Sequence, residues 1–344
     1  MSTRRLPVLA LGAGILLLLV LVLLAASGIR VMPSYLSVWL FVLSIPVGAL
    51  LLVSGLEMLA ADQHPGPAAL LPPLRALLPL LPVVALVGLP VLLFSGTLYD
   101  PMAWPAAGIG RAWFARIPFC LRFVLFLLTW SGLALLLARP GQSGARRGLA
   151  GIGFALTLVT GSLAASDWVM AVEPGLASSS FGLLFLSGDA LAAIAAASLL
   201  ATPMAVSRFA VPMLALLSAW MFLHFTQFLV IWSANKPDEA SWYLHRIDGL
   251  GSAGIVVAAL LFVLALVLLP RASATAARAV APLAWIILLV RLAESFWLVT
   301  PAFRGGVVVT IVDLVALVGL VALMLGLWAG RWLPLPRRPG HVVV

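Results

Sequence analysis

The stretch "PVLALGAGILLLLVLVLLAAS", residues 7–27, decides the fold class of this chain. It carries no charged residue, and at about 1.5 Å of rise per residue a helix of this length crosses the ~30 Å hydrocarbon core of a bilayer. Similar apolar blocks recur along the sequence, and 64% of its 344 residues are hydrophobic. Within lipid the backbone must bond to itself, so such blocks form helices. The sequence therefore predicts an all-α polytopic membrane protein.

Ten apolar blocks are long enough to span a membrane, and residues 1–344 are expected to form one transmembrane domain. The predicted spans are about 7–27, 34–58, 76–97, 117–138, 149–170, 180–201, 209–232, 250–270, 281–303 and 306–328. The first block follows Arg4 and Arg5, as a signal peptide would. Its apolar run exceeds the ~7–15 residues of a cleavable core, so we favour a retained anchor.

The arginines indicate the orientation of the spans. With a cytoplasmic N-terminus, the inner segments hold Arg4, Arg5, Arg75, Arg139, Arg146, Arg147, Arg208, Arg271, Arg278, Arg331, Arg337 and Arg338. The outer segments hold the smaller set of Arg30, Arg111, Arg116, Lys236, Arg246 and Arg304. This bias predicts that both termini lie in the cytoplasm. It also accounts for the net charge of +9 through topology and anionic lipid, without nucleic acid.

The number and spacing of cysteine and histidine residues argue against a metal site and against disulfides. The single cysteine, Cys120, excludes a disulfide framework within the chain. The four histidines, His64, His224, His245 and His341, lie in separate segments, and no two of them share ligand spacing on one helix. We therefore expect no metal ion and no haem.

Ionisable residues inside the predicted spans gather at one level. Counted from the predicted outer end of each span, the following residues lie roughly 8–14 Å deep: Arg122, Asp189, His224, Glu294 and Asp313. Arg291 lies one turn deeper than Glu294 on the same helix face. Because charges are unfavourable in a bilayer, each residue is a functional candidate unless a partner neutralises it. Static ion pairs of Arg291 with Glu294 or Asp313 are the alternative.

A second group of carboxylates lies in "AASDWVMAVEPGLASSS", residues 164–180. Asp167 and Glu173 are expected at the outer interface, with Trp168 as an interfacial anchor. Carboxylates leading from there to Asp189, His224 and Glu294 would form a half-channel for protons. This chain is a hypothesis, because sequence gives the depth of a residue and not its lateral neighbours.

The segment "HFTQFLVIWSANKPDEASWYLHR", residues 224–246, concentrates polar and aromatic groups in an otherwise apolar chain. A quinol site needs an apolar slot, a hydrogen-bond acceptor and a proton exit. Groups of these types are present at His224, Gln227, Trp232, Trp242 and Tyr243. The alternative is an aromatic belt beside a solvated loop that docks a partner protein, and we favour docking slightly.

Four stretches together resemble a known family. They are "WFARIPFCLRFVLFLLTW" (113–130), "SDWVMAVEP" (166–174), "TQFLVIWSANKPDEASWYLHR" (226–246) and "RLAESFWLVTP" (291–301). They resemble the second quinone-binding-type membrane subunit of alternative complex III, a bacterial quinol:cytochrome c oxidoreductase. That subunit is similar to the membrane anchors of the polysulfide-reductase superfamily. The resemblance covers roughly residues 111–313.

The resemblance implies an architecture, partners and site residues. It implies four-helix bundles over 34–170 and 180–303, flanked by the first and last helices, in the inner membrane of a bacterium. The implied partners are a homologous membrane subunit and subunits that carry iron–sulfur clusters and haem c on the outer side. Asp167, Trp168, Glu173 and Arg291 carry over from it as site residues, as do Gln227, Trp232, Asn235, Trp242 and Tyr243. The one small ligand that it implies is a quinone or quinol.

The favoured function is therefore a membrane subunit of a quinol-oxidising respiratory complex that contributes a quinone pocket or a proton path. Because the chain offers no evident ligands for a redox metal, electrons would leave through a partner subunit. One alternative is a secondary transporter that couples protons to a solute, which would favour broken helices near mid-membrane. The other is a purely structural anchor whose charges form static pairs.

Overall fold

A computed structural model confirms the predicted fold class. It describes residues 5–329 except 60–62, 100–111, 114, 140, 142–143, 174, 177, 248–249 and 269–273. In the described part of the chain, ten helices are long and apolar enough to cross a membrane. Among the basic residues used for topology, Arg4, Arg111, Arg271 and those after residue 329 lie outside this part. The cytoplasmic placement of both termini stays a prediction.

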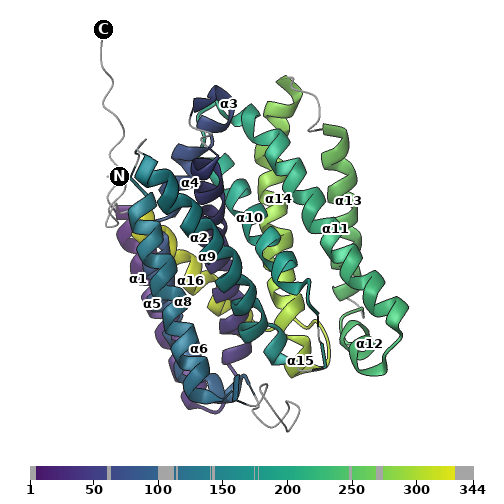
Figure 1. Ribbon diagram of the computed structural model, residues 1–344. Coiled ribbons are helices and arrows are strands. Elements are labelled where there is room, and N and C mark those ends of the chain that lie inside the picture. Colours follow the sequence, from purple (N-terminus) through teal and green to yellow (C-terminus); the bar gives the residue numbers. More distant parts are fainter. Residues whose placement is uncertain are drawn as a thin grey trace.

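The long helices run up and down one bundle (Figure 1). They are α1 (Arg5–Ala26), α2 (Met32–Met58), α8 (Arg116–Leu137), α9 (Gly144–Trp168), α10 (Phe181–Leu200), α11 (Ala210–Ala234), α13 (Leu250–Leu268), α14 (Ala274–Val299) and α16 (Ile311–Ala329). Span three consists of the short helices α3 (Pro65–Ala68), α4 (Leu71–Leu77), α5 (Leu80–Val87) and α6 (Leu89–Leu93).

Short helices join several of the spans. They are η2 (Ser95–Thr97), η3 (Met170–Val172), η4 (Val206–Phe209), α12 (Pro237–Leu244) and α15 (Pro301–Arg304). The face of the bundle that holds α6, α12 and α15, lower in Figure 1, is here called the α12 end. The opposite face, which holds α3, is called the α3 end. The topology predicted above would make the α12 end periplasmic.

Helices α2 and α10 form the centre of the bundle. They pack against each other, and α2 also contacts α4, α5, α8, α9, α14 and α16, while α10 also contacts α9, α11 and α14. Helix α1 packs mainly along α16, where glycines such as Gly14 and Gly326 let the two backbones approach closely. The division into two four-helix bundles stays a prediction.

The third span departs from the predicted range of 76–97, because it begins near Gly66 and is not one continuous helix. Its prolines remove backbone donors and interrupt the helical hydrogen bonds. Two side chains of α2 bind carbonyls of this interrupted stretch: Tyr35 Oη donates to Val87 O at 2.5 Å, and Trp39 Nε1 donates to Val84 O at 2.9 Å. Helix α2 therefore supplies bonds that water cannot supply within a bilayer.

Helices α2 and α10 approach each other closely at Gly48. A Cβ atom at this position would overlap the backbone carbonyl of Asp189. Only a residue without a side chain fits there, since both partners are helix backbone. This contact fixes the position of the α10 backbone at the residue that carries a buried carboxylate.

We predict that Gly48→Ala lowers the thermal unfolding midpoint in detergent, because one added methyl group must push α2 and α10 apart. Overpacking of this kind costs about 1–3 kcal/mol. Gly132→Ala is the matched control, because a Cβ on Gly132 meets no atom within 4 Å. That change should leave the midpoint equal or higher, since alanine favours helix over glycine. Equal midpoints for the two variants would contradict the predicted packing.

Candidate functional site

Three helices bring ionisable side chains together inside the bundle. The buried charged cluster consists of Asp189 on α10, Trp220 and His224 on α11, and Arg291 and Glu294 on α14. Glu294 Oε1 lies 2.8 Å from His224 Nε2 and accepts a hydrogen bond from Trp220 Nε1 at 3.1 Å. The other oxygen of Glu294 binds Arg291 Nη1. Arg291 Nη2 lies 3.5 Å from Asp189 Oδ1.

Helical spacing and one glycine account for this convergence. Arg291 and Glu294 are three residues apart and Trp220 and His224 four apart, so each pair shares one helix face. On α10, a Cβ atom at Gly188 would overlap the guanidinium of Arg291. The missing side chain at Gly188 thus leaves the space that Arg291 fills.

The cluster is buried and its formal charges do not cancel. Asp189, Arg291 and Glu294 are 2%, 5% and 7% exposed, whereas the His224 side chain is 21% exposed. One guanidinium faces two carboxylates, so with a neutral imidazole the sum is −1. Because uncompensated charge is unfavourable at this depth, one bound proton would make the cluster neutral.

Several polar atoms in and beside the cluster keep unused hydrogen-bonding capacity. Asp189 Oδ1, Arg291 Nε and Gln227 Nε2 are buried and have no hydrogen-bond partner within the described part of the chain. Gln227 lies almost one turn from His224 on α11, and its Oε1 accepts hydrogen bonds from Ser178 and Ser180. Buried polar groups are normally satisfied, so such atoms mark a place for water or a ligand.

Asp167 lies outside the cluster, in an ion pair of its own. Its oxygens accept hydrogen bonds from Arg122 Nε at 2.7 Å and Nη2 at 2.9 Å, and from Trp113 Nε1 at 2.9 Å. Trp168 is 1% exposed and lies among the rings of Trp39, Phe123 and Trp130. The expectation that Trp168 is an interfacial anchor is therefore wrong.

Asp313 also stays apart from the cluster, and the helix that carries it begins later than predicted. It accepts hydrogen bonds from Arg304 at 2.7 and 2.8 Å and from the backbone of Thr310 at 2.6 Å. Helix α16 begins at Ile311 and not near residue 306, because the chain turns at Gly305 with φ +69°. Asp313 thus lies in the first turn of α16, where a carboxylate stabilises exposed backbone N–H groups.

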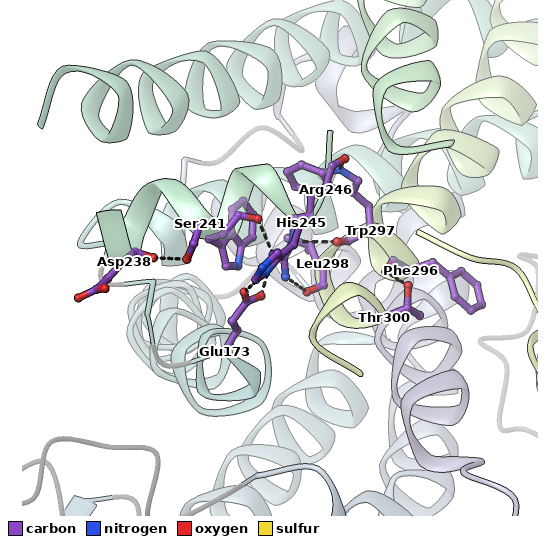
Figure 2. A network of polar contacts seen from close by, with 10 residues as sticks. Glu173, Asp238, Ser241, His245, Arg246, Phe296, Trp297, Leu298 and Thr300 are labelled. Carbon is purple, nitrogen blue, oxygen red and sulfur yellow. Dashed lines mark hydrogen bonds and ion pairs between the residues drawn. The ribbon is translucent and has the colours of Figure 1, made fainter. Parts of the chain in front are cut away.

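Glu173 anchors a fourth ionic site, at the α12 end (Figure 2). It lies 2.7 Å from Arg246 Nη1 and 2.9 Å from His245 Nδ1. The Arg246 side chain is 0% exposed and donates to the carbonyls of Trp242, Trp297 and Leu298 at 2.7–3.0 Å. This arginine therefore ties α12 to the end of α14 and to the connection between α9 and α10.

Burial and stacking shape the properties of Arg246. Its Cζ lies 3.8 Å from the ring centroid of Trp242, a cation–π geometry. Burial lowers the pKa of Arg246 to about 10, against the opposing charge of Glu173. Burial also raises the pKa of Tyr243 above its ordinary value, which the Arg246 charge partly offsets. Arg246 remains charged at neutral pH, so this network has a structural role and holds the connected segments together.

The proposed quinone or partner contacts separate into two groups. Trp242 is buried and packs against the rings of Tyr243 and Trp297. Trp232 is 69% exposed, and the exposed Asn235 ends α11 in a left-handed conformation. Of the candidates around residues 224–246, only His224 reaches the cluster, and Gln227 lies beside it.

Three residues that complete these sites, Trp220, Arg246 and Trp297, are not among the site residues predicted from the sequence. Trp220 precedes His224 by four residues and Trp297 follows Glu294 by three, so helical spacing contains the signal for both. The His224 ring packs edge-on against both indoles, with centroids 4.7 and 6.1 Å apart. Arg246 was counted only as a charge of an outer loop, and no local pattern marks it as buried.

No protein-family model matches the chain, and no curated protein matches it either. Within the described residues, no group of three or more His, Cys, Asp or Glu side chains could hold a metal ion. The function is therefore argued from the chemistry of the buried charged cluster.

We predict that Arg246→Lys lowers the free energy of unfolding by about 2–4 kcal/mol. A single ammonium cannot reach all three carbonyls and Glu173, and each lost charge-assisted hydrogen bond contributes about 1–3 kcal/mol. Thermal or denaturant unfolding in detergent measures the loss. The exposed Arg116, near the same end, provides the control Arg116→Lys, which should change the stability by less than about 0.5 kcal/mol. An equal effect of both substitutions would show that the hydrogen bonds of Arg246 do not stabilise the fold.

Proposed function

We propose that this multi-pass membrane protein is a subunit of a quinol-oxidising respiratory complex in the inner membrane of a bacterium. In this proposal the buried charged cluster accepts one of the two protons that the quinol releases on oxidation. The helical membrane architecture supports it, together with the resemblance of residues 111–313 to a membrane subunit of alternative complex III. The electrons would pass to partner subunits that carry iron–sulfur clusters and haem c.

The charge balance of the cluster is the observation that carries the proposal. A static ion pair in lipid needs equal charges, as at Asp167 with Arg122. The cluster instead holds two carboxylates for one arginine, and its most exposed member is a histidine. Imidazole side chains commonly accept and release protons in enzyme sites. The cluster therefore has the composition of a site that holds one exchangeable proton.

The geometry suggests how His224 would act. Its Nε2 faces Glu294, which leaves Nδ1 as the nitrogen that can accept a proton from a quinol hydroxyl. The imidazolium formed in this way would be stabilised by Glu294, and the charges of the cluster would then sum to zero. Trp220 and Trp297 flank the ring and offer the apolar walls that a quinol head group requires.

A secondary transporter is less well supported. Such a protein needs broken helices whose free backbone groups line a substrate path. Span three is broken, but the carbonyls of Val84 and Val87 are bound by Trp39 and Tyr35. That break is thus part of the packing between α2 and α5.

We predict that Glu294→Gln and Asp189→Asn lower quinol:cytochrome c activity in the complex isolated through this chain. A positioned proton acceptor contributes about 100-fold or more to a rate, so a loss of about that size is expected. Steady-state quinol oxidation and proton release by reconstituted vesicles provide the measurements. The complex should show the absorbance bands of haem c.

Glu57→Gln is the matched control, because Glu57 is also a buried, ion-paired carboxylate but lies toward the α3 end. It should leave the rate within about twofold of the original. Unchanged activity and proton release in both cluster variants would refute the proton site. A chain that purifies without cytochrome c, and drives solute uptake in vesicles, would favour transport instead.

A further inference from the structure

An apolar crevice of about 430 Å³ lies between α9 and α11, with α2 and α10 forming its floor. It runs lengthwise along these helices, from Leu59 at the α3 end to Leu183 on α10. Its lining is apolar apart from Ser187, whose hydroxyl donates to Leu184 O at 2.7 Å within α10. A helix is about 10 Å wide, so the crevice is too small for a helix and suits a single hydrocarbon chain.

Arg147 stands above this crevice on the same face of α9. Phe154 and Leu158 form the α9 wall. At 100° per residue around the axis of α9, the direction of Arg147 differs by about 20° from that of Phe154 and from that of Leu158. Gly151, between them on this face, lies against the side chain of Met58 at the end of α2. Since α9 begins at Gly144, Arg147 belongs to the first turn and lies at the α3 end of the crevice.

The charged side chains at this end gather around Glu57. Glu57 binds both Arg75 and Arg146, with the closest oxygen–nitrogen distances at 2.8 and 2.7 Å. One carboxylate thus faces two guanidiniums. Arg147 is partly buried, and no hydrogen bond or ion pair joins it to a residue in the described part of the chain. Within the described part of the chain, the mouth of the apolar crevice therefore carries a cation without a partner.

We propose that this crevice binds an anionic phospholipid, with one acyl chain along α10 and its phosphate at Arg147. An acyl chain satisfies the apolar lining, and the net negative charge of an anionic head group compensates the unpaired guanidinium, which a zwitterionic head group does not. A quinone would leave Arg147 without a counter-charge, because its head group is neutral. This lipid site does not depend on the proposed function.

Native mass spectrometry of the full-length protein in detergent tests the site. Phosphatidylglycerol and phosphatidylcholine with identical acyl chains serve as probes. Because one cation near a lipid phosphate contributes about 1 kcal/mol, the protein should retain phosphatidylglycerol about fivefold more strongly. Arg147→Gln should abolish this preference. The exposed Arg139 at the same end gives the control Arg139→Gln, which removes an equal charge and should keep the preference.

A second variant tests the crevice separately from the charge. Ser187→Leu fills the crevice and should weaken retention of both lipids, while Arg147→Gln weakens only the anionic one. Unfolding midpoints of the variants show whether each still folds. The proposal is overturned if Arg147→Gln keeps the preference, if Ser187→Leu changes nothing, or if a long-chain quinone displaces phosphatidylglycerol.

Discussion

A guanidinium within a bilayer needs a counter-charge. In the second half of the chain, Arg291 meets this need through carboxylates that neighbouring helix positions must supply. Its partners come from two helices, Glu294 from its own and Asp189 from α10. Glu294 in turn contacts His224 and Trp220 on α11. The order of α10, α11 and α14 therefore follows from one buried cation, while Gly188 provides the room for it.

The ionic sites of this protein differ in their charge balance. Asp167 and Asp313 each pair with one arginine, Arg122 and Arg304. Such pairs are neutral and suit a structural role. The cluster around Arg291 has one carboxylate more than it has guanidiniums. Proton chemistry is proposed at this unbalanced cluster, and binding of an anionic lipid is proposed at Arg147, at a different level of the same bundle.

Hydropathy alone predicts the helices, because the bilayer requires long apolar segments with internal hydrogen bonds. It also places Asp189, His224 and Glu294 at one depth. It cannot give their lateral convergence, which depends on the close backbone contact at Gly48 and on the space that Gly188 leaves for the Arg291 side chain. The position of Asp313 within its helix is mispredicted for a related reason. The chain turns at Gly305 and α16 begins only at Ile311, and hydropathy does not reveal such a turn. Arg246 could not be foreseen either, because its carbonyl partners come from segments about 50 residues apart.

The interrupted backbone of span three has a consequence for how the chain enters the membrane. Outside the assembled protein, the carbonyls of Val84 and Val87 would face hydrocarbon without the donors that α2 brings to them. Each such group is unfavourable by several kcal/mol in lipid. Span three is thus poorly suited to integrate as an isolated segment. Because α2 precedes span three in the sequence, α2 is synthesised before span three reaches the translocon. The two segments can therefore insert into the lipid together, as a helical pair.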